Sequence, residues 1–389
     1  MIFRTLIAMA VCTLGIARAA EPPLPADVAR WHAAGFTGQQ ITVAVLDSGF
    51  RGYRVHLPAS VEAKSFRTDG NLEPNDSMHG LICADATRRL APGCDLILAN
   101  WEPDDPRSFI AAVRWCRQHG ARIVSCSLVM PGWSDGRGGG PIHRELREAL
   151  GDALLFASAG NLAERHWTGP FHGRREHRWQ DAATANEVYP WGTQAVSIEL
   201  TASSDVRYLL HVRDQFGRDV AEDVPLPHAG PGSRAVRFIP DRTRQYVTSV
   251  ELIAGTPGEI RLIALGADLE YSTPRLGCMV FPGDGEKIIA VGAVDERGRR
   301  ADFSARGHAG ESIKPDLVAR VPLFTALRET PFRGTSAATP QAAAMAALLW
   351  SRDRQLTSRE IRARLYDCCV DVGEPGPDAD TGRGLPGLR

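Results

Sequence analysis

Four polar residues in separate short segments carry the functional groups of a hydrolase with a serine nucleophile. Ser336, in Gly-Thr-Ser-Ala-Ala-Thr-Pro, supplies a hydroxyl, and His79, in Met-His-Gly-Leu, supplies a base that can take its proton near neutral pH. Asp47, in Val-Leu-Asp-Ser-Gly, would hold the imidazole in one tautomer and stabilise the imidazolium. Asn161, in Ala-Ser-Ala-Gly-Asn, offers a side-chain amide to a developing oxyanion.

Each of these residues also has an ordinary structural explanation when it is taken alone. Thr335 or Ser336 can cap a helix, and a histidine before a glycine in a polar loop is commonly solvated. Asp-Ser-Gly and Gly-Asn are both common turn sequences. The joint occurrence of all four residues, in one order within one α/β pattern, favours the catalytic interpretation.

The segments around these residues predict the elements that position them. Asp47 ends an apolar run, so its carboxylate is expected at the carboxyl edge of a sheet, where α/β folds place their sites. His79 and Ser336 each open an apolar or small-residue stretch that predicts a helix, so both side chains are expected at helix amino termini. This position also turns the backbone N–H of Ser336 and the positive end of the helix dipole toward an oxyanion.

The pattern from residue 39 to residue 161 predicts an α/β fold. The predicted strands are apolar throughout, which is typical of a mostly parallel sheet with helices on both faces. These strands are expected at 42–46, 96–99, 123–128 and 154–157, and the helices at 108–119 and 141–150. The α/β pattern resumes at 287–292 and continues into helices at 336–350 and 358–365.

A different pattern interrupts the catalytic unit. Polar and apolar residues alternate at 196–200, 234–238 and 259–263, which predicts a β-rich antiparallel insert over residues 191–272. Residues 165–187 show no period and are predicted to be a loop. The catalytic domain would then consist of a first part, residues 21–190, and a second part, residues 273–389.

Composition and the amino-terminal residues limit the partners and the location. The net charge of −1 means that the chain lacks the excess of positive charge typical of proteins that bind nucleic acid. Residues 1–20 have a positive start at Arg4, a short apolar run and a small-residue cleavage site at 17–19, which together predict a signal peptide. The apolar run is too short to span a membrane. We therefore expect a secreted or periplasmic protein without a membrane span.

The four segments, in their order along the chain, resemble those of the subtilisin-like serine peptidases, the subtilase family. The resemblance implies a serine endopeptidase that cleaves polypeptides through an acyl-enzyme, with Asp47, His79 and Ser336 as the triad and Asn161 in the oxyanion hole. It also implies that an extended substrate pairs with one backbone segment and faces a second segment as the wall of a pocket. The residues implied are Ser127, Leu128 and Val129 for the first segment, and Ala157, Ser158, Ala159 and Gly160 for the second.

The sequence departs from the family pattern at Val129 and Met130, where glycines are usual, so we hypothesise a narrowed cleft. No cofactor is expected for the chemistry, no metal ligands are predicted, and structural calcium and the oligomeric state stay open. One alternative is a catalytically weak or inactive relative that only binds peptides. A second, an esterase, is disfavoured because the sequence has no Gly-x-Ser-x-Gly.

Overall fold

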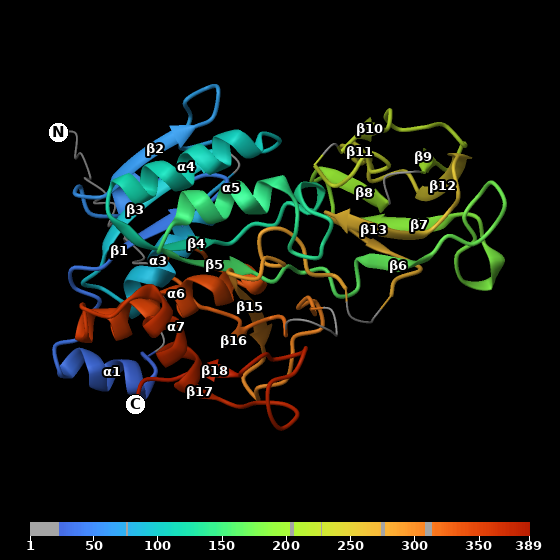
Figure 1. Cartoon of the computed structure of the whole chain (residues 1–389). Helices are drawn as coiled ribbons and strands as arrows, with labels where there is room; N and C mark the ends of the chain where they lie inside the picture. Colours follow the sequence, from blue (N-terminus) through green and yellow to red (C-terminus); the bar gives the residue numbers. More distant parts are fainter. Residues whose placement is uncertain (1–22, 75–76, 203–205, 227, 274–276, 308–312) are drawn as a thin grey trace, which may run out of the picture.

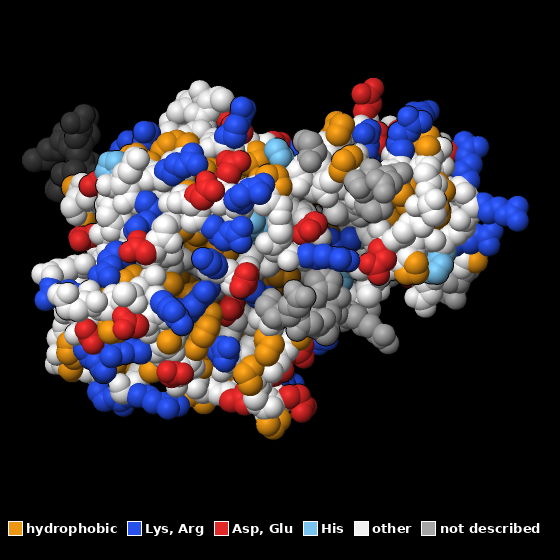
Figure 2. Space-filling view, viewed as in Figure 1, with side chains coloured by type: hydrophobic (Ala, Val, Ile, Leu, Met, Phe, Trp, Pro, Cys, Tyr) orange, Lys and Arg blue, Asp and Glu red, His pale blue; other side chains and the backbone are white. Residues whose placement is uncertain are grey.

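The computed structural model describes residues 23–74, 77–202, 206–226, 228–273, 277–307 and 313–389. The predicted signal peptide lies outside these residues. Figure 1 shows two parts, a sheet flanked by helices and a smaller all-β part beside it. Lys and Arg side chains are interspersed with Asp and Glu on the face seen in Figure 2, in keeping with the net charge of −1. Within the described ranges, no helix is both long enough and apolar enough to cross a bilayer.

The helix-flanked part is built on a seven-stranded sheet with the strand order β16-β15-β5-β4-β1-β3-β2. Every neighbouring pair in this sheet is parallel. The strands are β1 (Thr42–Leu46), β2 (Glu62–Phe66), β3 (Asp95–Trp101), β4 (Ala121–Cys126), β5 (Leu154–Ser158), β15 (Ile289–Val294) and β16 (Leu317–Arg320). The predicted mostly parallel sheet is confirmed.

The strands inside this sheet are buried on both faces, as the uninterrupted apolar runs predict, whereas the edge strand β2 is exposed or half-buried along its length. Along β1, Val43 and Val45 join a core cluster with residues of α1, α3, α6 and α7, whereas Ala44 and Leu46 join a second cluster with α4 and α5. The helices are α1 (Ala26–Ala33), α2 (Tyr53–His56), α3 (His79–Leu90), α4 (Pro106–Gln118), α5 (Pro141–Leu150), α6 (Thr335–Arg352) and α7 (Ser358–Asp367), with short 3₁₀ turns η1 (Pro131–Trp133) and η2 (Gln180–Ala182). The prediction of helices on both faces is confirmed.

The all-β part contains two antiparallel sheets. One has five strands, β10 (Val224–Pro225), β11 (Arg234–Phe238), β8 (Val196–Ala202), β13 (Glu259–Leu265) and β6 (His166–Pro170). The other has four, β14 (Ala267–Leu269), β7 (Asn186–Pro190), β12 (Tyr246–Ala254) and β9 (Arg207–Asp214). Residues of both sheets share one apolar cluster, so the β-rich part has a core of its own. A last antiparallel pair, β17 (Cys369–Val370) and β18 (Leu385–Pro386), lies near the carboxyl terminus.

The antiparallel strands begin earlier than the predicted insert. Strands β6 and β7 precede residue 191, and the prediction of a loop over residues 165–187 is wrong where it overlaps them. Strand β6 shows no alternation and contains Gly169 and Pro170, so nothing local indicates a strand. It is ordered by pairing with β13, from His166 opposite Ile263 to Pro170 opposite Glu259. The division of the chain into domains stays a prediction.

Candidate active site

Asp47 follows directly after β1, at the carboxyl edge of the parallel sheet. Its side chain is fully buried, and its backbone N–H continues the sheet by donating to the carbonyl of Ala99. Gly80 allows helix α3 to approach this point. A Cβ atom at Gly80 would lie 2.7 Å from the Cβ of Asp47 and 2.6 Å from the ring of Phe50, closer than real contacts allow. The glycine after His79 therefore has a packing role that brings the histidine next to the aspartate.

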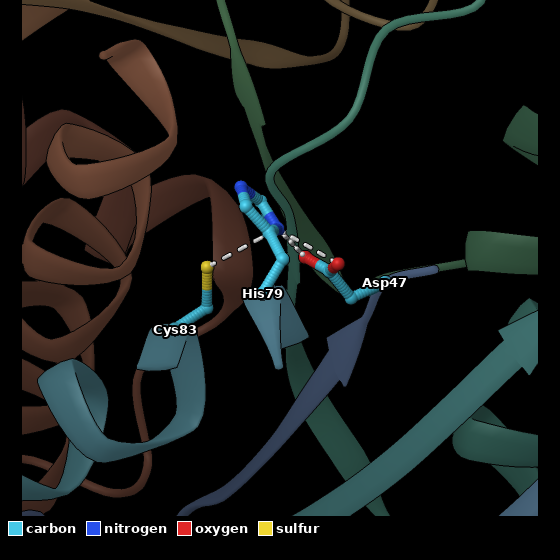
Figure 3. A group of neighbouring side chains, drawn as sticks. All are labelled: Asp47, His79 and Cys83. Carbon is cyan, nitrogen blue, oxygen red and sulfur yellow. Dashed lines mark hydrogen bonds and ion pairs between the residues drawn. The ribbon is translucent and has the colours of Figure 1, made fainter. Parts of the chain in front are cut away.

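His79 is the first residue of α3, and its ring meets the carboxylate of Asp47. The Nδ1 atom lies 2.8 Å from Oδ1 and 2.9 Å from Oδ2 of Asp47, so a neutral imidazole can donate its Nδ1–H to the carboxylate. In Figure 3 the second ring nitrogen points away from Asp47. With the proton held on Nδ1, the Nε2 atom is left as an acceptor, as a general base requires. The imidazole and the ring of Phe332 also pack edge to face, with 5.5 Å between the ring centroids.

Two opposing effects set the protonation of His79. Burial by itself lowers the pKa of His79, but the adjacent Asp47 carboxylate stabilises the charged ring, and the net result is a pKa raised well above the ordinary value of 6.5. The same interaction stabilises the imidazolium that forms when the base takes a proton.

Cys83 is a neighbour of this pair that the sequence did not indicate as functional. It lies one helical turn after His79, and its sulfur is 4.0 Å from His79 Nδ1 and 3.7 Å from the backbone oxygen of Ser336. Figure 3 shows His79 and Cys83 on the same face of α3. Burial raises the pKa of Cys83, which favours a neutral thiol. The i, i+4 spacing from His79 is the sequence signal that could have found this residue.

Ser336 lies in the first turn of α6, and Gly334 precedes that helix with a φ of 89°, a left-handed value that suits glycine. The Ser336 hydroxyl donates to the carbonyl of Ser127 at 2.9 Å, and the Ser127 hydroxyl donates to the carbonyl of Ser336 at 3.2 Å. The Ser336 hydroxyl therefore points to the Ser127 carbonyl and makes no hydrogen bond with the ring of His79, a residue that the structure also describes. Catalytic hydrogen bonds are often long or misaligned when no substrate is bound.

Asn161 lies beside the start of α6 and is oriented by Thr335. Its Oδ1 accepts from the backbone N–H of Thr335 at 2.9 Å and from the Thr335 hydroxyl at 3.1 Å. These two hydrogen bonds fix the orientation of the amide, and Nδ2 makes no hydrogen bond to any residue in the described part of the chain. A Cβ atom at Gly334 would lie 2.8 Å from that Nδ2, so Gly334 leaves the amide group its space.

The seven residues predicted to bind substrate differ in their accessibility. Val129 and Gly160 are neighbours, since a Cβ atom at Gly160 would lie 3.5 Å from Cγ1 of Val129. Leu128 is partly buried, whereas Ser127 is buried and contacts Ser336. The other three, Ala157, Ser158 and Ala159, are buried at the end of β5. Their part in substrate binding stays a prediction.

Backbone donors in the second predicted segment are already engaged. The N–H of Ala159 donates to the carbonyl of Val291, and the N–H of Gly160 donates to the hydroxyl of Thr335. A wall formed by this segment would therefore contact substrate mainly through carbonyl groups and atoms of Gly160.

One group of potential metal ligands occurs among the described residues. Single ligand atoms of Asp47, His79 and Cys83 all lie within 4.8 Å of one another. Two of these residues are already engaged with each other through the Nδ1–carboxylate contact, and the third has a pKa raised by burial. The arrangement is suited to holding an imidazole in one tautomer for proton transfer.

Comparison with known proteins finds the subtilase family. The family model Peptidase_S8, the subtilase family, matches residues 239–384, a range that contains Ser336 but not Asp47, His79 or Asn161. A thermostable alkaline protease of Halalkalibacterium halodurans is 32% identical over 128 residues, which are 33% of this chain and 34% of the relative. Subtilisin DY of Bacillus licheniformis is 34% identical over 161 residues, or 41% of this chain and 53% of the relative. The chain thus spans between about a third and a half of these two relatives.

Among solved structures, the CspB protease of Clostridium perfringens is similar over most of its length. It superposes with a TM-score of 0.64 at 16% identity, covering 92% of this chain and 94% of that one. The predicted subtilisin-like fold and the predicted resemblance to the subtilase family are confirmed.

Proposed function

We propose that this chain, a subtilase-like protein by sequence and by fold, is a serine endopeptidase that cleaves polypeptides through an acyl-enzyme. The observation that carries the proposal is the placement of His79 Nδ1 within 2.9 Å of both carboxylate oxygens of Asp47. It leaves Nε2 as the acceptor for a serine proton. The contacts of Cys83 with His79 and with the backbone of Ser336 support a position of the hydroxyl near this base.

In the proposed reaction, the Ser336 oxygen attacks the carbonyl carbon of the scissile peptide bond while its proton passes to His79 Nε2. Asp47 keeps the Nδ1 proton in place and stabilises the imidazolium. The negative charge on the former carbonyl oxygen is met by the Nδ2 group of Asn161 and by the backbone N–H of Ser336. The C–N bond then breaks, and His79 gives its proton to the leaving amine. In the second half of the reaction, water attacks the acyl carbon while His79 takes its proton. The bond to the Ser336 oxygen then breaks, and His79 returns the proton to that oxygen. No cofactor takes part.

Covalent labelling provides the direct test of the nucleophile. A serine-directed fluorophosphonate should label the wild-type protein, because the activated hydroxyl displaces fluoride from phosphorus, and should leave Ser336→Ala unlabelled. One observation favours the alternative, a catalytically weak or inactive peptide-binding protein. The Ser336 hydroxyl donates its proton to the carbonyl of Ser127 and not to His79. A folded wild-type protein that resists labelling would support that alternative.

The amide of Asn161 should matter for turnover more than for binding. We expect Asn161→Ala to lower kcat by about a hundredfold to a thousandfold with little change in KM, because the Nδ2 donor acts on charge that develops only in the transition state. Steady-state kinetics on one peptide would measure both constants. The exposed Asn71, whose side chain accepts from the backbone of Glu73, provides the matched control Asn71→Ala. Equal kcat values for Asn161→Ala and wild type would remove Asn161 from the oxyanion hole.

The pH dependence should follow His79. Only the neutral imidazole can accept the serine proton, and the Asp47 carboxylate keeps the ring charged to a higher pH, so kcat/KM should rise with pH with a midpoint above 6.5. In Asp47→Asn the midpoint should move to lower pH, because the carboxylate no longer stabilises the imidazolium. A pH–rate profile of each protein checks both statements. A flat profile for wild type between pH 6 and about 9 would exclude a histidine base.

Export is also part of the proposal. Residues 1–20 are proposed to be a signal peptide that directs the protein to a secreted or periplasmic location. Amino-terminal sequencing of the protein recovered from outside the cytoplasm should show a new amino terminus just after the segment Ala17-Arg18-Ala19.

A further inference from the structure

A cavity lies where the β-rich part meets the segment that follows β4. It has a volume of about 390 Å³. The segment from Val129 to Trp133 forms one side of the cavity. The β-rich part forms the other side, with Glu199 in β8, Arg237 in β11, and Leu226 in the segment between these strands. The cavity is therefore shared between the helix-flanked part, which carries the proposed triad, and the β-rich part.

Glu199 presents an unusual group to this cavity. The residue is only 4% exposed, and its Oε1 accepts from the hydroxyl of Ser197 at 3.1 Å. Its Oε2 is buried and makes no hydrogen bond of regular geometry with the residues that the structure describes, although the backbone N–H of Gly132 is near enough to lower the pKa of the carboxyl somewhat. A Cβ atom at Gly132 would lie 3.2 Å from Oε2, so the glycine keeps space open beside this oxygen. Burial raises the pKa of Glu199. A buried carboxylate without a partner is unfavourable, and a cation beside it would offset the loss of hydration.

Two carboxylates, Glu199 and Asp104, line the cavity together with two groups that can carry positive charge, Arg237 and His228. Arg237 places Nη1 2.8 Å from Oδ2 of Asp104 and Nη2 3.7 Å from Oε1 of Glu199. One guanidinium thus faces two carboxylates, and its closer contact is with Asp104. Because Arg237 approaches Oε1, the Oε2 atom of Glu199 can still accept a hydrogen bond from another cation. Glu199 and Asp104 line the same cavity.

The cavity is also close to the proposed path of the substrate. Val129 lines it and lies two residues after Ser127, whose carbonyl accepts from the Ser336 hydroxyl at 2.9 Å. An extended chain advances about 3.3 Å per residue, so two residues span about 7 Å. A peptide that lies along Ser127 to Val129 would bring a side chain to the cavity within a few residues of the bond attacked by Ser336.

We propose that this cavity is a specificity site for a lysine or arginine side chain of the substrate, two to four residues upstream of the scissile bond. Glu199 Oε2 is the acceptor that recognises it, and Asp104 adds negative charge at the rim. The proposal rests on the proposed peptidase function for its connection to cleavage. It assigns the β-rich part a share in substrate selection.

Matched peptides test the assignment. Three pairs of internally quenched peptides would carry arginine or its uncharged analogue citrulline at the second, third or fourth residue upstream of the cleaved bond. At one of these positions, arginine should raise kcat/KM by about tenfold to a hundredfold, the range for a hydrogen bond to a charged group. Glu199→Gln should bring the arginine-to-citrulline ratio close to one. Glu222→Gln, the same change at an exposed position of the β-rich part, should leave the ratio as in wild type.

A second variant guards against a folding defect in Glu199→Gln. The Asp104 side chain is 69% exposed, so Asp104→Asn should fold normally. Without Asp104, Arg237 is free to pair with Glu199, and the arginine preference should fall part of the way. Absence of an arginine preference at all three positions, or an unchanged ratio in both folded variants, would overturn the assignment.

Binding to Ser336→Ala separates this proposal from the proposed hydrolysis. The uncleaved arginine peptide should bind Ser336→Ala more tightly than the citrulline peptide, and the double variant Ser336→Ala/Glu199→Gln should bind the two equally. If wild type neither cleaves peptides nor reacts with the fluorophosphonate but this Glu199-dependent difference persists, the hydrolysis fails and the cavity assignment stands. If wild type cleaves and is labelled but shows no arginine preference, the hydrolysis stands and the cavity assignment fails.

Discussion

Ser336→Ala is expected to lower kcat for peptide hydrolysis by about six orders of magnitude, since the variant has no nucleophile and retains only binding and oxyanion stabilisation. The substitution removes one oxygen, whose hydrogen bond goes to the carbonyl of Ser127. A small loss at a partly buried position should leave the fold and the unfolding temperature nearly unchanged. Turnover of a quenched peptide, followed over hours with both proteins at known concentration, would measure the difference.

Ser249→Ala is the matched control for this prediction. Ser249 lies in β12 of the β-rich part, at a partly buried position away from the proposed site. It tests the same loss of a hydroxyl without touching the proposed nucleophile, and its kcat should equal that of wild type. If Ser336→Ala kept more than about a thousandth of the wild-type kcat after contamination by active protein was excluded, the acyl-enzyme mechanism would have to be abandoned.

Asp47→Asn is expected to lower kcat by about four orders of magnitude while the geometry around it is kept. An asparagine side chain has nearly the same shape, but its amide can donate to Nδ1 and so favour the tautomer with the proton on Nε2. The imidazole would then have no free acceptor for the proton of Ser336. The two contacts of 2.8 and 2.9 Å between His79 and Asp47 make this the second largest effect that we expect.

Asp219→Asn supplies the control for this substitution. Asp219 also accepts from a histidine, since its Oδ1 lies 3.1 Å from Nδ1 of His211, but the pair belongs to the β-rich part. Steady-state kinetics should show wild-type kcat for Asp219→Asn. An Asp47→Asn protein with native circular dichroism and less than a tenfold loss of kcat would argue that His79 is held by something other than this carboxylate.

The four proposed site residues could be found from the sequence because each one lies within three residues of the end or beginning of an element with a strong local signal. The apolar run before Asp47 predicts strand β1 with the bounds that the structure has, and the small residues after Ser336 predict α6 within two residues of its ends. Hydrophobic periodicity depends only on neighbours along the chain, so it can be recognised without the fold. The positions of these residues at strand and helix ends were predictable for the same reason.

The features that were missed depend on partners distant in the sequence. Strand β6 is defined by its pairing with β13, and the approach of Cys83 to Ser336 requires α3 and α6 to pack together. Likewise, alternation in residues 196–200 predicts a strand but does not indicate that Glu199 faces a cavity beside Val129. Such contacts arise from packing between elements, which local periodicity does not encode.

The sequence by itself determined the residue types of the proposed site, the elements that bear them and the separation of the chain into α/β and β-rich patterns. Only the tertiary structure decided that Asp47 contacts Nδ1 of His79, that Thr335 orients Asn161, and that Glu199 is buried with an oxygen unpaired. The physical reason is that propensity and periodicity are properties of short segments. Hydrogen-bond distances and burial, in contrast, are set when the elements close around a common core.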